Sequence, residues 1–449
     1  MTGITRMASA TGRRPQGPAL TRRMVLGAGL AAVALPRAGL AAERRLTAGP
    51  VIAQILPEGD GTTAMLGLNG TTPGPDLRLR QGEVLDVMFE NRTGAASALH
   101  WHGIRIDNAM DGVPGLTQPV VEDGEDFRYR FAAPDAGTFW YHSHNRSWEQ
   151  VERGLYGALI VEEPDPPAVD HDITVLIDDW RLEETGALIE GFGNRHDFAH
   201  AGRLGNYARA IASVTHVRRG DRVRLRLINA ATARVFPLEI SGVTGRIVAL
   251  DGMPLAAPRE IGEIVLAPAQ RLDVIADVTG TVRFDFPTRQ GPYELGRIAA
   301  EGDNPEPIGG VVGPLPAARV APPAAPTQRL TLRMEGGAMG GRHAGDDIWA
   351  FNGISGMAEA PFARFARGET AEIVLINDTA FPHGIHLHGH HFFELDAGGA
   401  PGDLRDTTLV APGETRAILC GFDNPGKWLL HCHMLGHQAA GMKTWVEVA

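Results

Sequence analysis

The feature that most restricts the fold of this chain is one phrase that occurs three times. It reads QGEVLDVMFEN at 81–91, RGDRVRLRLIN at 219–229 and RGETAEIVLIN at 367–377. Each copy contains a glycine, an acidic residue, a stretch with apolar residues at alternate positions, and a final asparagine. Such alternation predicts a β-strand. Because the copies lie 138 and 148 residues apart, they predict three related domains of ordinary size.

The rest of the chain has the same character. Short runs rich in Val, Ile, Leu and Phe alternate with Gly, Pro and Asp turns, and no long stripe has the 3.6-residue period of a helix. This pattern predicts an all-β protein built from antiparallel sandwiches. A Pro- and Ala-rich stretch at 313–328 predicts a linker. The predicted domains are 42–165, 166–312 and 329–449.

The N-terminal segment predicts export. Arg22 and Arg23 precede an apolar run from Met24 to Leu35, which small residues follow. This arrangement is typical of a twin-arginine signal peptide, which we place at 1–41. As a membrane anchor the run is too short, since about 20 apolar residues are needed to cross a bilayer. We therefore expect the twin-arginine machinery to export the folded protein to the periplasm or beyond, without a membrane span in its mature form.

Charge and cysteine content exclude other classes. The net charge is −11, and removal of the six arginines in 1–41 leaves −17, so nucleic acid is not an expected partner. Cys420 and Cys432 are the only cysteines, which cannot form a disulfide framework. Cys420 is expected to be a buried apolar residue on a strand.

Four His-x-His pairs indicate a metal cluster. With 17 histidines in 449 residues, chance would give about one such pair or fewer. Alternate residues of a strand share a face, so each pair presents two imidazoles to one side, and neutral imidazole is a good copper ligand. The pairs are His100 and His102, His142 and His144, His386 and His388, and His431 and His433.

The same alternation separates a second site. Cys432 lies between His431 and His433, so its thiol points to the opposite face of that strand. His383 stands three residues before His386 and also points away from its neighbouring pair.

Two residues that follow complete the set. His437 and Met442 come shortly after Cys432 in one loop. With His383 they give two imidazoles, a thiolate and a weak thioether, which is the ligand set of a blue copper electron-transfer centre. The tripeptide 431–433 thus joins the two predicted sites covalently and offers electrons a short through-bond route.

These motifs, in this order, resemble those of the multicopper oxidase family, which includes laccases, bilirubin oxidases and bacterial cuprous oxidases. The resemblance covers nearly all of the predicted mature chain, and the ending HCHxxxHxxxxM is specific. It implies three cupredoxin-like domains, each a Greek-key β-sandwich, and four copper ions. It also implies that electrons from a reducing substrate reduce dioxygen to water.

By motif position, the resemblance assigns ligands to each copper. The type 1 ligands would be His383, Cys432, His437 and Met442. The type 2 ligands would be His100 and His386. The type 3 ligands would be His102, His142, His144, His388, His431 and His433. The substrate is expected to meet an exposed imidazole edge of His437 or His383. The remaining histidines are expected to be structural or at the surface.

Water formation consumes protons, so an acid is needed near the cluster. Asp111 stands where the family keeps a carboxylate for this purpose, although a turn residue before Gly112 is an equally consistent interpretation. Two departures from the family pattern stand out. Gly384 replaces the usual proline after the first type 1 histidine. Gln438 replaces the acid that many bacterial relatives have after the second, which puts a second proton relay in doubt.

The sequence leaves the substrate open. Metal-oxidising bacterial relatives carry a long methionine-rich insert, whereas this chain has only MEGGAMGGRHAGDD at 334–347. Met334, Met339 and His343 could dock Cu(I), but an ordinary Gly-rich loop explains them better. A laccase-like oxidation of phenols is therefore the leading hypothesis, and a periplasmic cuprous oxidase is the alternative. A copper-binding or scaffold protein of the same fold is a third, although every expected ligand is present.

Overall fold

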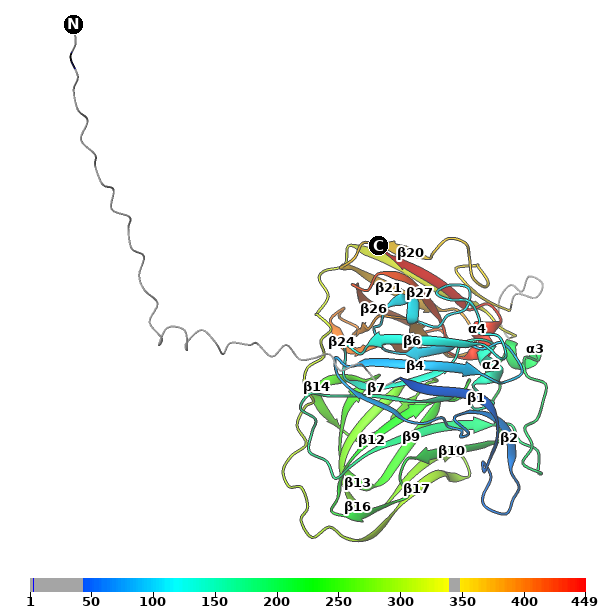
Figure 1. The fold of residues 1–449 in the computed structure, drawn as a ribbon, viewed down its shortest axis with the longest axis vertical. Coiled ribbons are helices and arrows are strands. Elements are labelled where there is room, and N and C mark those ends of the chain that lie inside the picture. Colours follow the sequence, from blue (N-terminus) through cyan, green and yellow to red (C-terminus); the bar gives the residue numbers. More distant parts are fainter. Residues whose placement is uncertain (1–2, 4–42, 339–347) are drawn as a thin grey trace. The chain divides into compact units, whose positions relative to one another are not determined.

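The computed structural model describes residue 3 and residues 43–338 and 348–449. Except for Gly3, the predicted signal peptide lies outside these residues. The described chain is built almost entirely from β-strands (Figure 1). Its helices are short, and they are η1 (Asn108–Met110), α2 (Ser147–Gln150), α3 (Arg195–Ala199) and α4 (Leu435–Ala439). The predicted all-β fold is confirmed.

The first domain is a sandwich of two four-stranded sheets, in the orders β2-β1-β4-β6 and β3-β8-β7-β5. Its strands are β1 (Arg44–Ala53), β2 (Thr63–Leu68), β3 (Leu77–Arg80), β4 (Val84–Asn91), β5 (Leu99–His102), β6 (Asp126–Ala132), β7 (Gly137–Ser143) and β8 (Tyr156–Glu162).

The second domain forms a nine-stranded sheet with the central order β10-β9-β12-β16-β13-β14. Its strands are β9 (His171–Trp180), β10 (Tyr207–Ala212), β11 (His216–Arg219), β12 (Arg222–Asn229), β13 (Phe236–Leu250), β14 (Met253–Glu260), β15 (Ile264–Leu266), β16 (Arg271–Thr288) and β17 (Gly291–Asp303).

The third domain has a six-stranded sheet, β19-β18-β21-β26-β23-β24, and a five-stranded sheet, β20-β28-β27-β22-β25. Its strands are β18 (Gln328–Gly336), β19 (Trp349–Phe351), β20 (Ala363–Phe365), β21 (Glu369–Asn377), β22 (His383–Leu387), β23 (Phe392–Leu395), β24 (Pro401–Arg405), β25 (Thr407–Val410), β26 (Thr415–Phe422), β27 (Gly426–Cys432) and β28 (Lys443–Val448).

The repeated phrase forms an equivalent strand in each domain. β4, β12 and β21 each pair in parallel with the first strand of their domain and antiparallel with a later strand. The asparagine that ends each strand is fully buried and donates side-chain hydrogen bonds to main-chain carbonyl groups. It thereby satisfies buried acceptors where the strand stops. These residues are Asn91, Asn229 and Asn377.

Strand β12 departs from the simple alternation. Arg224 and Arg226, which the pattern would leave on a solvent-facing side, are each only 1% exposed. Arg224 pairs with Asp273 at 2.7 Å and with Glu163 of the first domain at 2.9 Å. The packing of the first domain against this sheet buries the arginines, and the carboxylates supply the partners that buried charges require.

Each domain has its own hydrophobic core, centred on Leu85 and Phe89 in the first, Leu225 and Val274 in the second, and Ile373 in the third. At one edge of the molecule α2, α3 and α4 lie close together (Figure 1). This edge therefore brings loops of all three domains to one place.

Candidate metal centres

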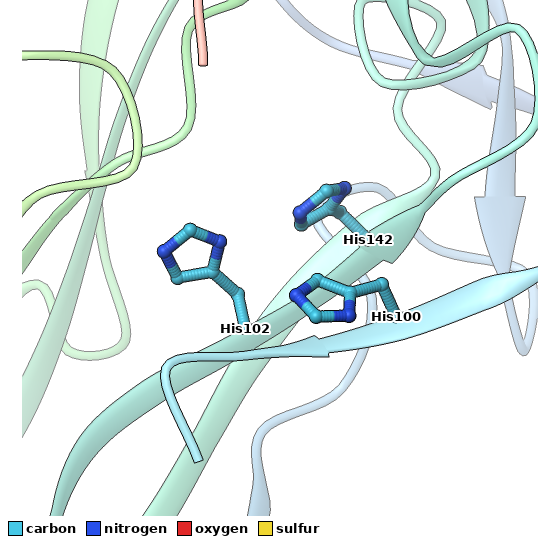
Figure 2. A group of neighbouring side chains, drawn as sticks. All are labelled: His100, His102 and His142. Atoms are coloured by element: carbon cyan, nitrogen blue, oxygen red, sulfur yellow. The ribbon is translucent and has the colours of Figure 1, made fainter. Parts of the chain in front are cut away.

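Two pairs of antiparallel strands, each with the residues that directly follow it, supply the eight paired histidines. In the first domain β5 and β7 run antiparallel, with His100 directly opposite His142. In the third domain β22 and β27 place His386 directly opposite His431 in the same way. Figure 2 shows that the rings of His100, His102 and His142 gather on one side of their two strands. Each pair of strands thus presents four imidazoles to one face.

The two sets of imidazoles meet at the boundary between the first and third domains. His100 stacks on His388 with ring centroids 3.9 Å apart, and His102 stacks on His386 at 3.8 Å. We call all eight the eight-histidine group. Three triplets within it have ligand atoms within 4.8 Å of one another, and they are His100–His102–His142, His100–His386–His388 and His144–His388–His431.

Many ring nitrogens of the eight-histidine group have no hydrogen-bond partner although they are buried. An unpartnered buried polar atom is costly, so a cluster of such nitrogens indicates a metal-binding site. His388 Nε2 and His431 Nε2 face each other at 3.1 Å. The unpartnered atoms are His100 Nε2, His102 Nδ1, His142 Nε2, His144 Nε2, His386 Nε2 and both ring nitrogens of His433.

Main-chain carbonyl groups orient several of these rings. The Nδ1 atom lies 2.7 Å from the Asp111 carbonyl in His100 and 2.9 Å from the Ser143 carbonyl in His142. The Nδ1–H group donates this bond, so the lone pair is on Nε2, the nitrogen that faces the cluster. This is the tautomer that a metal-binding histidine needs.

Burial keeps six of these imidazoles neutral, those of His102, His142, His144, His388, His431 and His433. Desolvation, followed by repulsion from His100, holds the pKa of His142 well below its usual range. Desolvation is also the main cause for His388, whose pKa is likewise far below its ordinary value. Only neutral imidazole has a lone pair for a metal, so these histidines are ready for binding.

A second group lies on the other face of β27. Cys432 Sγ lies 3.5 Å from His383 Nδ1 and 3.8 Å from His437 Nδ1, and the two nitrogens are 3.1 Å apart. We call these three residues, with Met442, the thiolate group. Burial raises the pKa of the Cys432 thiol to about 12, so without a metal the sulfur remains protonated.

Met442 is held beside this group by its main chain. Its carbonyl accepts a bond from the Cys432 amide at 3.1 Å, and its amide donates to the His437 carbonyl at 2.9 Å. The side chain is fully buried in the core of the third domain. The short helix α4, which contains His437, thus folds the chain back so that Met442 meets the end of β27.

The expectation of an exposed imidazole edge is wrong. His437 and His383 have no exposed surface. His437 Nε2 donates to the carbonyl of His200 at 2.6 Å, and His383 Nε2 lies 2.8 Å from Thr379 Oγ1. Helix α3 of the second domain packs here, which one domain's sequence pattern could not reveal.

Asp111 lies beside the eight-histidine group. Its carboxylate is 3.0 Å from His388 Nδ1 and 3.3 Å from His100 Nδ1, and the residue is 1% exposed. It therefore bridges a histidine of the first domain and one of the third. A residue that only formed a turn would not need its carboxylate in contact with two histidines.

Asp406 is a second carboxylate at the cluster, and sequence reasoning missed it. Its Oδ1 lies 3.3 Å from His102 Nε2, and its carbonyl accepts from His386 Nδ1 at 2.9 Å. Although burial opposes ionisation, Arg271 and the two histidines hold the pKa of Asp406 well below its usual range. Asp406 belongs to no recognisable sequence motif. The sequence feature that could have indicated it is a lone acidic residue between two short strands, in LRDTT.

The other predicted positions are placed as follows. Met334 is fully buried in the core of the third domain, whereas Met339 and His343 lie outside the described residues. Cys420 is a buried free thiol on β26, as expected. Gly384 has room for a side chain, since a Cβ atom would meet no neighbour closer than 3.7 Å.

Gln438, at the position of the missing acid, lies in a surface pocket that also contains His144 and Lys443. Its side-chain oxygen accepts from Ser147 at 3.2 Å. Position 438 therefore supplies an amide to this pocket in place of a carboxylate.

Three protein-family models, each described as multicopper oxidase, match the chain at residues 52–166, 171–296 and 324–449. The chain belongs to the multicopper oxidase family. Copper fits both groups described above, since the unpartnered buried nitrogens and the set of two imidazoles and a thiol are the donors this metal takes.

Individual multicopper oxidases resemble the chain over most of its length. The structure of Lac15 from a marine microbial metagenome is 58% identical, with a TM-score of 0.80, over 90% of this chain and all of that one. Copper resistance protein A of Pseudomonas syringae pv. tomato is 26% identical over 86% of this chain and 89% of its own. Laccase-1 of Botryotinia fuckeliana is 28% identical over 84% and 77%.

Among the residues that the structure describes, no helix is long and apolar enough to cross a bilayer.

Proposed function

We propose that this multicopper oxidase is laccase-like and couples the one-electron oxidation of phenolic donors to the reduction of dioxygen to water. The observation that carries the proposal is the continuity of the two groups. Cys432 belongs to the thiolate group, while His431 and His433, its covalent neighbours, belong to the eight-histidine group. Electrons collected at one group thus have a path along a single strand to the other.

We assign the ligands by their place in these groups. His383, Cys432, His437 and Met442 would hold the type 1 copper, and His100 and His386 the type 2 copper. The type 3 pair would be held by His102, His142, His144, His388, His431 and His433. When bound, copper would supply one-electron transfer in the thiolate group and dioxygen reduction in the eight-histidine group.

The chain's own groups supply the protons and the order of the site. Asp111 contacts two imidazoles of the eight-histidine group, and a buried carboxylate in this position can pass protons toward forming water. Asp406 and Arg271 hold His102 and His386 in place from the side. The proton role of Asp111 is consistent with the four protons that the reduction of one dioxygen to water consumes.

The choice of a phenolic donor over Cu(I) rests on the residues that could dock Cu(I) and on the relatives of the chain. Met334, one of the three residues that could dock Cu(I), is fully buried and cannot meet an ion from solvent. The resemblance to Laccase-1 supports an organic donor. The resemblance to Copper resistance protein A supports Cu(I) as the second candidate. The twin-arginine motif at Arg22 and Arg23 supports a periplasmic or secreted location.

Oxygen uptake by the copper-loaded protein distinguishes the candidates. Faster turnover with a methoxyphenol than with Cu(I) would support the laccase-like function, and faster turnover with Cu(I) would establish the metal oxidase. Cys432→Ser serves as the inactive control, and Cys420→Ser, which changes a buried thiol elsewhere, should retain activity. Uptake with neither donor would contradict both candidates.

A further inference from the structure

Helix α3 of the second domain and the residue that caps its C-terminus present two histidines near the thiolate group. His196 and His200 are four residues apart, and their rings are stacked with centroids 4.1 Å apart. The His196 side chain is 78% exposed, whereas His200 is half-buried. His200 is the C-terminal cap of the helix and has non-helical backbone angles, so it is the stacking, and not a helical spacing, that brings the two imidazoles close enough to bind one metal ion together.

His200 has the hydrogen bond that is typical of a metal-binding histidine. Its Nδ1 lies 2.8 Å from the His196 carbonyl. Because the Nδ1–H group donates this bond, the lone pair of the ring is on Nε2. The nitrogen that would bind an ion is therefore free to do so.

The helix that carries the pair is fixed at both ends. Asn194 caps it by accepting a bond from the Asp197 amide at 2.9 Å. At the other end the Phe198 carbonyl accepts from Trp349 Nε1 at 2.6 Å, and the Ala199 carbonyl accepts from the Ala338 amide at 2.7 Å. The backbone under both imidazoles is therefore held in place before any ligand arrives.

The pair is also directly connected to the thiolate group. The carbonyl of His200 accepts the 2.6 Å hydrogen bond from His437 Nε2. An ion on the His200 ring would therefore be held by the same residue that covers His437. The net charge of −17 outside 1–41 attracts cations rather than anions to the surface.

We propose that His196 and His200 form a binding site for a transition-metal ion of the borderline class, such as Zn²⁺ or Cu²⁺, at the electron-entry face. The stacked rings must turn for both Nε2 atoms to meet one ion. The exposure of His196 permits that rotation without disturbing the core. A bound redox-inert ion would obstruct the approach of organic donors to His200 and so inhibit their oxidation.

Calorimetric titration of the copper-loaded protein with Zn²⁺ tests the site, because the resident copper sites are then filled. His196→Ala is the main variant, since an exposed side chain can be removed without loss of the fold, and His196→Ala/His200→Ala removes the whole site. Loss of a ligand should weaken Zn²⁺ binding about tenfold or more. The matched control is His216→Ala, which removes another exposed histidine of the same domain and should leave the affinity unchanged.

A second measurement follows the consequence of binding. Zn²⁺ should inhibit methoxyphenol oxidation by the wild-type protein and the His216→Ala variant, but not by the His196→Ala variant. Equal Zn²⁺ affinity in the wild type and the His196→Ala variant would overturn the proposal, as would equal weakening by His216→Ala. The binding measurement does not rest on the proposed function, so it decides this site even if no phenol is oxidised.

Discussion

The guanidinium group of Arg271, in the second domain, donates two hydrogen bonds to the carboxylate of Asp406, in the third, and neither side chain has exposed surface. Asp406 also contacts His102 of the first domain. This ion pair therefore joins all three domains at the edge of the eight-histidine group.

We expect Arg271→Leu to lower the free energy of unfolding by about 3 to 5 kcal/mol, because it leaves a buried carboxylate without its counter-charge. Denaturant unfolding followed by tryptophan fluorescence measures the loss. The matched control is Arg329→Leu, whose side chain is 75% exposed beside Glu372 and whose ion pair contributes little. A similar loss in both variants would show that the buried pair has no special role.

Removal of the thiol should separate the two metal groups. Cys432→Ser is expected to bind one copper fewer per chain, because the thiolate group loses its strongest ligand while the eight-histidine group keeps all of its ligands. Atomic absorption measures copper per chain. Cys420→Ser should match the wild type. Loss of all copper from the Cys432→Ser variant would mean that the two groups do not fill independently.

Asp111→Asn should slow one half of the catalytic cycle. Loss of a positioned acid typically costs about a hundredfold or more in rate, so reoxidation of the fully reduced protein by dioxygen should slow by that order. Reduction of the thiolate group by the donor should be unchanged. Stopped-flow absorption measures both steps. The control is Asp107→Asn, an exposed acid on the same loop, and equal slowing of both steps would argue against the proton role.

Glu152 should make stability fall as pH rises. Burial raises the pKa of this carboxyl from 4.5 to about 7, although Arg203 opposes the shift. Between these values the unfolded chain ionises Glu152 and the folded chain does not, so the contribution of Glu152 to stability should fall by about 3 kcal/mol from pH 4.5 to 7.

The amide of Glu152→Gln does not titrate, so this variant should gain that amount relative to the wild type over the same pH interval. Denaturant unfolding at both pH values measures the difference. Glu190→Gln, at a side chain 67% exposed, should show no such gain. An unchanged difference between wild type and Glu152→Gln would contradict the raised pKa.

Much of this protein was determined by local sequence. The period of two along a strand accounts for the repeated strands that end in Asn91, Asn229 and Asn377. It also accounts for the opposite directions of Cys432 and its histidine neighbours. These relationships depend only on backbone geometry within one strand, so a single segment contains all the information they need.

Tertiary structure decided the rest, because it depends on which surfaces meet. The stacking of His100 on His388 and the burial of Arg224 require domains to pack, and no local pattern encodes that packing. Asp406 can lie buried and charged at the cluster because Arg271 of another domain compensates its charge. Likewise, the carbonyl of His200 covers His437 because a helix of the second domain lies over the third. The sequence by itself determined on which face of its strand each candidate ligand lies, and the contacts between domains decided how these side chains meet and what can reach them.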